Sequence, residues 1–298
     1  MQKIALLGVP SSAGAHWPGQ EKAPGYLRQE GLVKQLKSID LDIIDFGDLP
    51  IARYKPDIEN RNQQNLDKVI EVALNVGKII ELALKKNLIP IIIGGDCTIE
   101  LGVITGFLQQ NQDPGLIYFD GHIDLNTPET SPSGIFDSMG VAHMIGIPGS
   151  NDRLSHIGNR FPLLSEENIT LFGFNVKESN SVELDTLAKL NSLKYAIDDV
   201  RKAPAEVSNY VCKFYENKNK KFIVHLDVDV IDFTDMPIAD VPQFSAGLSF
   251  EKVIFCISIF ASSPNFGGLV ITEFNPDHVY DNGETTKRFL EGISGALA

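Results

Sequence analysis

Short apolar runs recur along the chain and alternate with longer amphipathic stretches. Each run has the length and the β-branched content that are typical of a strand buried on both faces. We therefore predict strands at residues 4–9, 41–46, 89–93, 116–119, 169–174, 194–197, 222–230 and 268–274.

The stretches between these runs carry the pattern of amphipathic helices. In residues 65–86, for example, Val69, Ala73, Val76 and Ile80 recur close to a 3.6-residue period. Similar patterns predict helices at residues 181–191, 205–217 and 249–261. Strand followed by helix, repeated, predicts an α/β fold, with a mainly parallel sheet of about eight strands and helices on both faces. No linker divides the chain, so we expect residues 1–298 to form one three-layer domain.

Polar residues follow several of the predicted strands. In parallel sheets, ligands bind beyond the carboxyl ends of the strands. The strand at 116–119 leads into Asp120, His122 and Asp124, which would share one face if the extended conformation persists. Two carboxylates and an imidazole so close together are unfavourable unless a cation compensates them. The alternative is a solvated acidic turn, but the preceding apolar run points to a buried position.

A second acidic cluster lies at the end of the predicted strand at 222–230. Asp227 and Asp229 alternate there with aliphatic residues, and His225 falls on the same face. Buried acids are costly unless they are paired or bind a metal. The four aspartates of the two clusters would balance the charge of two divalent cations. Carboxylate and imidazole ligands favour Mn²⁺, with Zn²⁺ or Fe²⁺ as alternatives, and such a pair can activate a bridging water.

These motifs, in this order, resemble those of the ureohydrolases: arginase, agmatinase and their relatives. Asp120-Gly-His-Ile-Asp124 is similar to the Asp-Ala-His-x-Asp signature of that family, and Leu226-Asp-Val-Asp-Val-Ile-Asp232 to its Asp-Val-Asp-x-x-Asp signature. The opening residues 4–12 and the late segment Ile271-Thr-Glu-Phe-Asn-Pro276 also match, so the resemblance covers almost the whole chain.

The resemblance implies roles for individual residues. It implies metal ligands at Cys97, Asp120, His122, Asp124, Asp227 and Asp229, and a guanidinium-holding carboxylate at Glu273. The segment 124–134 looks like that of arginases, which implies that Asn126, Ser131 and Ser133 contact the amino-acid end of a substrate. Glu178 falls near an acidic position that would meet the α-amino group.

Two positions depart from the family pattern. Cys97 stands where the family has a histidine ligand, and a thiolate is a softer ligand that matches Mn²⁺ poorly. A cysteine here is similar to the residue expected in hydrolases that act on Nω-hydroxy-arginine. The family's loop histidine, the expected proton shuttle, is aligned with Met139. His143 lies four residues on, and is either a replacement shuttle or a surface histidine.

Composition limits the other function classes. The net charge of −13 argues against nucleic acids and anionic membranes as partners. Three scattered cysteines do not form a disulfide framework, and no apolar run is long enough to span a membrane. We expect a cytoplasmic protein that forms homo-oligomers, as family members commonly do.

Two functions follow from these observations. The first is metal-dependent hydrolysis of an arginine-like guanidino amino acid, which gives ornithine plus urea, or hydroxyurea from Nω-hydroxy-L-arginine. The second is a non-catalytic relative of the ureohydrolases that binds a ligand or assembles with other chains. Cys97 and Met139 motivate the second function, whereas the retained aspartates argue against it.

Overall fold

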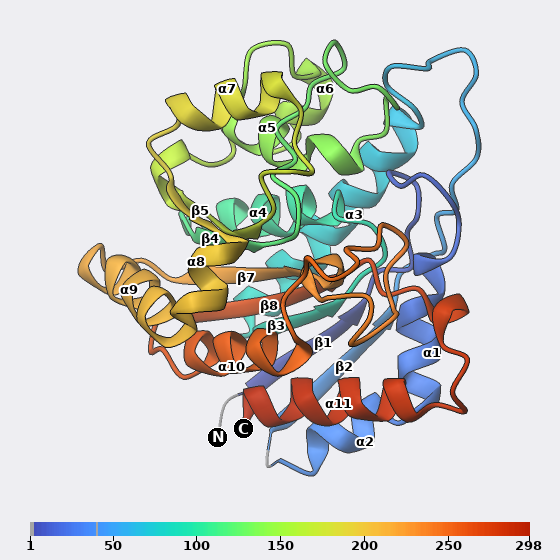
Figure 1. Cartoon of the computed structure of the whole chain (residues 1–298), viewed down its shortest axis with the longest axis vertical. Helices are drawn as coiled ribbons and strands as arrows, with labels where there is room; N and C mark the ends of the chain where they lie inside the picture. Colours follow the sequence, from blue (N-terminus) through green and yellow to red (C-terminus); the bar gives the residue numbers. More distant parts are fainter. Residues whose placement is uncertain (1–2, 40) are drawn as a thin grey trace.

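Eight strands form one parallel sheet at the centre of the molecule (Figure 1). A computed structural model describes residues 3–39 and 41–298. The order across the sheet is β2-β1-β3-β8-β7-β4-β5-β6, so β3, β8, β7 and β4 are its central strands. The strands are β1 (Lys3–Gly8), β2 (Asp42–Asp48), β3 (Ile89–Ile93), β4 (Gly115–Phe119), β5 (Ile169–Phe174), β6 (Leu193–Ala196), β7 (Phe222–Asp227) and β8 (Phe266–Thr272). All eight predicted strands are present, each with bounds shifted by at most three residues.

Helices cover both faces of the sheet, as the strand–helix alternation predicts (Figure 1). The α-helices are α1 (Ala23–Gln29), α2 (Leu32–Lys37), α3 (Leu66–Lys85), α4 (Ile99–Gln109), α5 (Gly140–Ile145), α6 (Asp152–Ser155), α7 (Ser181–Lys189), α8 (Ile197–Lys202), α9 (Pro204–Asn217), α10 (Phe250–Ala261) and α11 (Glu284–Leu297). Short 3₁₀ turns are η1 (Gln20–Lys22), η2 (Asp137–Met139), η3 (Glu166–Asn168), η4 (Val228–Val230) and η5 (Pro276–His278).

Two hydrophobic cores lie on opposite faces of the sheet. In β3, Ile91 and Ile93 pack into the core beneath α1, α2, α9, α10 and α11, whereas Ile92 packs into the core beneath α3, α4 and α5. This alternation explains why the strands are apolar runs, because a strand covered on both faces has no solvent-facing side. The apolar stripe of α3, including Val76 and Ile80, packs into the second core. None of the described helices has the length and apolar character needed to cross a membrane.

β7 ends three residues earlier than its apolar run predicts, whereas β4 ends where predicted. β7 ends at Asp227, and residues 228–230 turn as η4. The side chain of Asp227 causes this turn in part, because it accepts a hydrogen bond from the Asp229 backbone N–H at 2.7 Å. Likewise β4 ends at Phe119, and the Asp120 carboxylate accepts the His122 N–H at 2.6 Å. The acids are therefore grouped by turns at the strand ends and not by extended alternation.

Candidate metal centre and substrate cavity

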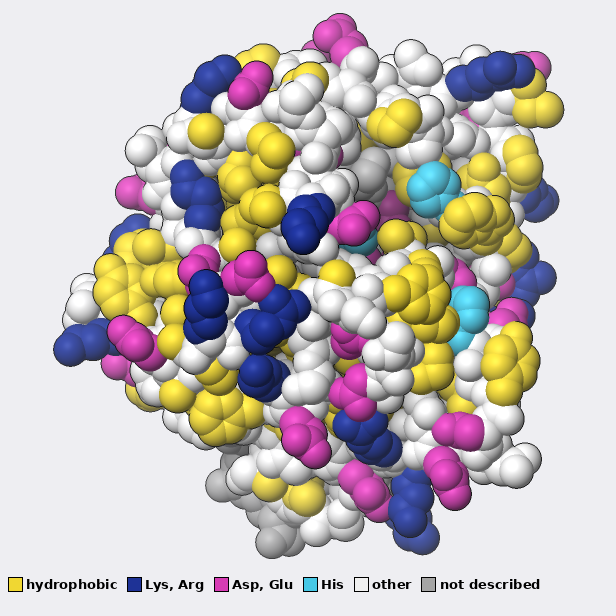
Figure 2. Space-filling view, in the orientation of Figure 1, with side chains coloured by type: hydrophobic (Ala, Val, Ile, Leu, Met, Phe, Trp, Pro, Cys, Tyr) yellow, Lys and Arg dark blue, Asp and Glu magenta, His cyan; other side chains and the backbone are white. Residues whose placement is uncertain are grey.

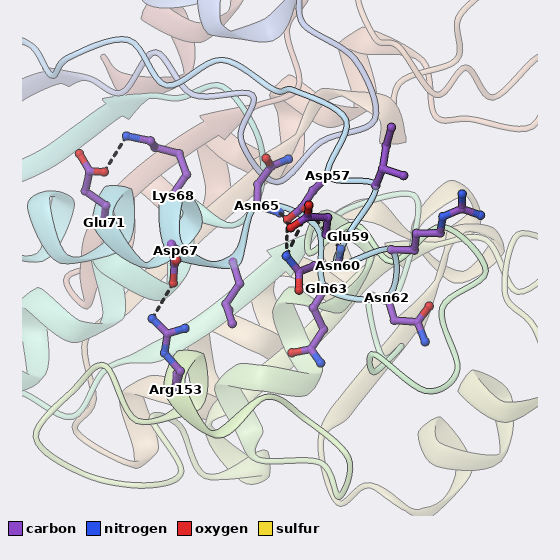
Figure 3. Close-up of a pocket in the computed structure, with 13 residues that line it drawn as sticks. Asp57, Glu59, Asn60, Asn62, Gln63, Asn65, Asp67, Lys68, Glu71 and Arg153 are labelled. Atoms are coloured by element: carbon purple, nitrogen blue, oxygen red, sulfur yellow. Dashed lines mark hydrogen bonds and ion pairs between the residues drawn. The ribbon is translucent and has the colours of Figure 1, made fainter.

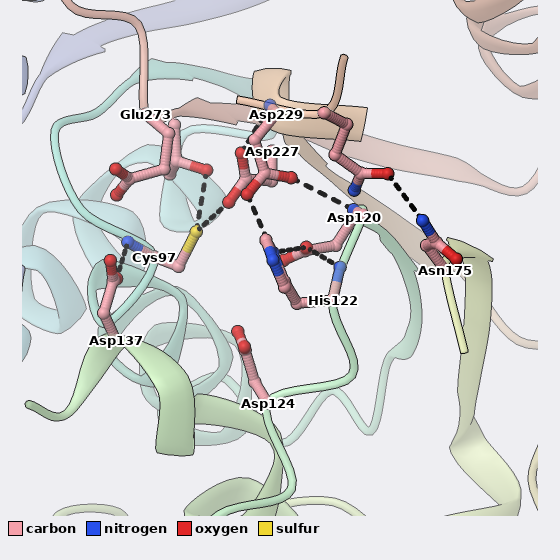
Figure 4. Close-up of polar contacts among 12 residues, drawn as sticks. Cys97, Asp120, His122, Asp124, Asp137, Asn175, Asp227, Asp229 and Glu273 are labelled. Carbon is pink, nitrogen blue, oxygen red and sulfur yellow. Dashed lines mark hydrogen bonds and ion pairs between the residues drawn. The ribbon is translucent and has the colours of Figure 1, made fainter. Parts of the chain in front are cut away.

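A cavity of about 170 Å³ opens at the carboxyl ends of the central strands. Its walls come from the segments that follow β3, β4, β7 and β8, which are neighbours in the sheet. Figure 4 shows Cys97, Asp120, His122, Asp227, Asp229 and Glu273 drawn together there, with Asp137 and Asp124 beside them. On the face shown in Figure 2 the molecule is hollowed near its centre, with acidic and histidine side chains at the hollow.

One half of the site consists of Asp120, His122 and Asp229. Each offers a ligand atom within 4.8 Å of the others. The Nδ1 atom of His122 lies 2.8 Å from the Asp229 carboxylate and 3.6 Å from that of Asp120. The second oxygen of Asp229 accepts the Gly121 N–H at 3.1 Å, which fixes its orientation. We call these three residues the His122 half.

The other half lies around Cys97 and Asp227. The Sγ atom of Cys97 is 3.0 Å from the Asp227 carboxylate and 3.2 Å from the Thr272 hydroxyl. It is also 3.3 Å from Nε2 of His225. Cys97, Asp120 and His225 again place ligand atoms within 4.8 Å of one another. We call Cys97, Asp120, Asp227 and His225 the Cys97 half; Asp120 belongs to both halves.

The Gly94-Gly95 pair after β3 sets the position of Cys97. A Cβ on Gly95 would lie 1.6 Å from the carbonyl oxygen of Ser11, so no other residue fits there. The Gly95 carbonyl in turn accepts the Glu273 N–H at 2.8 Å. A sequence pattern that looks like an ordinary glycine turn therefore joins three segments at the cavity.

Burial and like charge perturb the acids of the site. Burial raises the pKa of Asp120, and the charge of Asp229 adds to the effect. Burial, followed by the charges of Asp229 and Asp120, raises the pKa of Asp227 well above its usual range. Burial and the nearby Asp227 raise the pKa of the Cys97 thiol as well. Burial opposes charge on His122, but the carboxylates of Asp229 and Asp120 together outweigh it and raise the pKa of the ring well above normal. Such a group of buried acids suits divalent cations, whose charge removes the conflict.

Asp124 lies at the edge of the two halves and is held separately. Its carboxylate accepts a hydrogen bond from the buried hydroxyl of Tyr118. Its backbone is left-handed, with φ of 47°. Burial and the charge of Asp120 raise the pKa of Asp124 well above its usual range. Non-glycine residues in this conformation are uncommon and tend to cluster at functional sites.

Glu273 follows β8 and is the second residue of the site with left-handed backbone, with φ of 64°. One carboxylate oxygen accepts a hydrogen bond from Gln20 at 2.8 Å. The other, Oε1, is buried and has no hydrogen-bond partner among the described residues. Burial, and then the charge of Asp137, raise the pKa of Glu273 well above its usual range. An acceptor without a partner in a cavity wall is suited to a ligand with N–H donors.

Sequence reasoning missed Asp137. Its carboxylate accepts the Cys97 N–H at 2.8 Å and lies within 4.8 Å of ligand atoms of Cys97 and Glu273. Burial and the charge of Asp96 raise the pKa of Asp137 well above its usual range. Its signal in the sequence is an acid within an otherwise apolar and hydroxyl-rich loop, but the alignment of the family's loop histidine with Met139 points away from it.

His143 and Met139 lie outside the cavity. Met139 is fully buried in the core beneath α3, α4 and α5. Both ring nitrogens of the fully buried His143 have backbone partners: the Met139 carbonyl at 2.8 Å and the Asn151 N–H at 2.9 Å. Burial lowers the pKa of His143 to about 4. His143 is therefore neither a surface histidine nor placed to act as a shuttle, and Asp137 is the titratable residue of this loop that lines the cavity.

Of the four residues predicted to bind the amino-acid end of a substrate, two line the cavity and two do not. Asn126 and Glu178 line the cavity. Ser131 and Ser133 do not line it; Ser131 lies 3.5 Å from the hydroxyl of Ser138, which does. The amide oxygen of Asn126 accepts hydrogen bonds from Thr130 at 3.1 Å and from Asn180 at 2.9 Å, so its orientation is fixed. The lining also includes His16, Ser179 and Glu183, which sequence reasoning did not identify.

A larger surface depression, of about 790 Å³, lies at the start of α3 (Figure 3). Its charged groups are satisfied locally, as in the ion pairs Arg153–Asp67 and Lys68–Glu71. Asp57 accepts hydrogen bonds from Asn60. Exposed pairs of this kind are ordinary surface features. The smaller cavity, with its converging buried acids, is therefore the better candidate site.

The fold and the site together define an α/β protein with an acidic centre, a candidate metal site, at the carboxyl ends of a parallel sheet. The model of the arginase family matches residues 2–293. The chain belongs to this family of hydrolases.

Individual relatives agree with that membership. An arginase from Staphylococcus aureus (strain MRSA252) is 28% identical over 282 residues, which are 92% of this chain and 91% of that protein. The solved arginase structure from Bacillus caldovelox matches with a TM-score of 0.89 at 23% identity, covering 100% of this chain and 99% of the other. The structure of Entamoeba histolytica arginase in complex with L-ornithine has a TM-score of 0.84 at 26% identity, with the same coverage.

Proposed function

We propose that this protein hydrolyses the guanidino group of an arginine-like amino acid and releases ornithine. Water supplies oxygen to the guanidino carbon, the bond from that carbon to the side-chain nitrogen breaks, and the nitrogen leaves as an amine. The co-product is urea from arginine or hydroxyurea from Nω-hydroxy-L-arginine. The observation that carries the proposal is the convergence of Asp120, His122, Asp227 and Asp229 beside the unpartnered oxygen of Glu273.

The ligand set fits two divalent cations. Asp120 offers a ligand atom to both groups of candidate ligands, so its carboxylate would be shared, and Asp124 and Asp227 would complete the site. Two bound cations supply a water of lowered pKa and stabilise the charge that develops at the carbon. The His122 half has only nitrogen and oxygen donors, which suit Mn²⁺. The sulfur of Cys97 makes Zn²⁺ or Fe²⁺ the alternatives for the other half.

Glu273 and Asp137 would hold the guanidinium group. Their carboxylates lie on either side of Cys97, with ligand atoms within 4.8 Å of it. A carboxylate accepts paired N–H donors from a planar guanidinium, and the charge strengthens these hydrogen bonds. Holding the group between two acids would also fix the carbon against the metal centre, which is the positioning that a hydrolase needs.

The outer wall of the cavity would recognise the amino-acid end. Asn126 and Glu178 stand there, together with Glu183. An acidic residue is suited to an α-ammonium group, and a carboxamide can donate to an α-carboxylate. Ser131 and Ser133 would act through Ser138, because the hydroxyls of these serines form one chain of contacts.

Two features favour Nω-hydroxy-L-arginine as a second candidate substrate. Cys97 stands where the family has a histidine ligand, and the loop in which the family's shuttle histidine is expected presents Asp137, not a histidine, to the cavity. A hydroxyguanidine is less basic than a guanidine, so it places a smaller demand on a proton shuttle. Both substrates would meet the same carboxylates and the same metal centre.

A substrate panel tests the proposal. The protein would be loaded with Mn²⁺, and separately with Zn²⁺, and given arginine, Nω-hydroxy-L-arginine, agmatine and shorter guanidino acids. We expect ornithine with urea or hydroxyurea from at least one of the first two. Asp120→Asn should remove most of that activity.

Two results would contradict the proposal and favour the non-catalytic function. One is a metal content below about one ion per chain after loading, since the reaction requires a filled centre. The other is the absence of ornithine from both substrates with a full metal load. Agmatine turnover with no reaction on arginine would instead show that the outer wall does not recognise an amino-acid end.

A further inference from the structure

His225 is a buried polar residue that the proposed reaction does not use. It lies in β7, two residues before Asp227, and its side chain is fully buried. Its ring stacks on that of Tyr118, with centroids 4.4 Å apart and an angle of 5° between the planes. The stacking fixes the plane of the imidazole, so the ring nitrogens point in defined directions.

A carboxylate holds the far side of the ring. Nδ1 of His225 lies 3.1 Å from an oxygen of Glu100 in the first turn of α4. Glu100 is fully buried, and its other oxygen has no hydrogen-bond partner among the described residues. With Nδ1 directed at this carboxylate, Nε2 is the ring nitrogen that is placed to bind a metal. This carboxylate–imidazole arrangement is the one that typically orients a histidine ligand for a metal.

The free nitrogen faces the thiol. Nε2 of His225 is 3.3 Å from Sγ of Cys97, and both lie within 4.8 Å of a carboxylate oxygen of Asp120. Two ligands of one tetrahedral Zn²⁺, with Zn–S of about 2.3 Å and Zn–N of about 2.0–2.1 Å, would be about 3.6 Å apart. The observed separation of the two atoms is close to that value. A carboxylate oxygen of Asp227, 3.0 Å from Sγ, completes a set of four donors.

We propose that Cys97, His225, Asp120 and Asp227 bind one thiophilic divalent cation of the Zn²⁺ class, and that Glu100 positions His225 for this purpose. The imidazole that the Cys97 position lacks is thus supplied by β7, which is separated from β3 by β8 in the sheet. The inference rests on the proposed function in one respect, because both assign Asp120 as a ligand that the two halves share. A soft sulfur donor selects Zn²⁺ over Mn²⁺, whereas the His122 half keeps the nitrogen and oxygen donors that suit Mn²⁺.

The alternative is that His225 merely forms a neutral hydrogen bond to the Cys97 thiol in the core. That arrangement leaves the buried carboxyl groups of Glu100, Asp120 and Asp227 around Cys97 and His225 without a cation, and one Glu100 oxygen has no hydrogen-bond partner among the described residues. Buried charges without compensation are costly. A cation bound between Cys97, His225 and the two aspartates provides the missing charge.

The test is metal binding to the full chain, read by spectroscopy and not by turnover. Metal-free protein would be prepared with a chelator and titrated with Co²⁺ alone and with Zn²⁺ alone. We expect one equivalent of Co²⁺ to give a thiolate-to-cobalt charge-transfer band. X-ray absorption of the sample with one equivalent of Zn²⁺ should show one sulfur at about 2.3 Å and imidazole nitrogen at about 2.0–2.1 Å.

Variants separate the ligands from their support. Cys97→Ser should abolish the charge-transfer band. His225→Gln should keep the band but weaken Zn²⁺ binding by at least about 100-fold, and Glu100→Gln should weaken it by about 10- to 100-fold. Cys256→Ser and His143→Gln are matched controls, since both residues are fully buried and lie outside the cavity, and they should leave the affinity unchanged.

Several results would overturn the inference. They are a Zn²⁺ site without sulfur, a site with sulfur whose affinity is unchanged in His225→Gln, or no Co²⁺ band in the wild-type protein. The X-ray absorption measurement uses the wild-type chain, so a variant that fails to fold does not leave the inference untested. A sulfur- and imidazole-bound Zn²⁺ in a protein without ornithine release would overturn the proposed function alone. Ornithine release from a sulfur-free centre would overturn this inference alone.

Discussion

The two halves of the candidate metal centre share Asp120, but the sequence predicts the ligands of one half more completely than those of the other. The His122 half has the residue types that the sequence motifs predict, and they converge as expected. In the Cys97 half, a cysteine stands where the family motif has a histidine, and His225 of β7, two strands away in the sheet, lies 3.3 Å from it. The two halves share one carboxylate but differ in donor chemistry, because the Cys97 half contains a sulfur atom and the His122 half contains only nitrogen and oxygen donors.

The backbone around the Cys97 half is held by contacts that do not involve the Cys97 side chain. Gly95 is locked against Ser11, and Glu273 is tied to the Gly95 carbonyl, so the walls of the cavity do not depend on the side chain at position 97. His225 lies in the central strand β7, and its ring contacts the side chain of Cys97. Chemistry at such a site can therefore change through side chains alone, while the strand ends remain fixed.

The largest effect that the comparison predicts comes from the residue common to both halves. Asp120→Asn removes a charge from each group of ligands, so both cations should be lost and activity should fall by about 10³-fold or more, about 4 kcal/mol. Metal analysis and product assays measure this. Asp152→Asn, at an exposed acid outside the cavity, is the matched control. Activity within tenfold of the wild type would show that the halves do not share Asp120.

Glu273→Gln should separate substrate binding from metal binding. The neutral amide loses the charge-assisted hydrogen bonds to a guanidinium, so kcat/KM should fall by about 100-fold, about 3 kcal/mol. The affinity of both halves for metal should remain, because the Glu273 carboxylate is assigned to substrate. Steady-state kinetics and metal titration on the same sample test this. Loss of a metal ion in this variant would place Glu273 in the Cys97 half instead.

His143 offers a buried imidazole outside both halves as a reference. Its pKa of about 4, against about 6.5 in an unfolded chain, means that the folded state favours the neutral ring. This contribution is complete above pH 6.5 and is lost as the pH falls toward 4, by up to about 3 kcal/mol. His143→Gln should flatten the fall in the free energy of unfolding over that window, as measured by denaturation in urea.

The exposed His156 gives the control for this measurement; its ring hydrogen-bonds to the Asp152 carbonyl and stacks on Phe161. His156→Gln should keep the pH dependence of the wild type. A pH dependence in His143→Gln equal to that of the wild type would show that His143 does not titrate between the two states.

The smallest effect should come from Asp137. Asp137→Asn removes one of two carboxylates near the guanidinium, with Glu273 remaining. The KM for arginine should rise about tenfold, about 1.4 kcal/mol, and the KM for the less basic hydroxy-arginine should rise less. The ratio of the two KM values is an internal control. An unchanged KM for both substrates would show that Asp137 does not contact the substrate and only orients Cys97, by accepting the hydrogen bond from the Cys97 backbone N–H.

The fold followed from the sequence because burial on both faces makes each strand a recognisable apolar run. The residues of the His122 half followed because acids at the ends of such runs are conspicuous. What the sequence could not give was the local geometry. Asp227 ends β7 by capping its own turn, and neighbouring turns, not strand alternation, bring the acids together.

Loop residues were harder to predict for a different physical reason. A loop has no periodicity, so Asp137 and Met139 could not be told apart by pattern, and only packing shows that Met139 is in the core. Strand alternation places His225 on the same face as Asp227. Its contact with Glu100, however, joins β7 to α4 across 125 residues of sequence. Long-range pairs of this kind are visible only in the folded chain. Oligomer formation and a cytoplasmic location stay predictions.

The most direct test of the central claim is hydrolysis in ¹⁸O-labelled water, with the metal-loaded protein and either arginine or Nω-hydroxy-L-arginine. Attack of water on the guanidino carbon predicts one ¹⁸O atom in each urea or hydroxyurea molecule and none in ornithine, by mass spectrometry. Ornithine carrying the label, or no ornithine at all from a fully loaded protein, would contradict the claim.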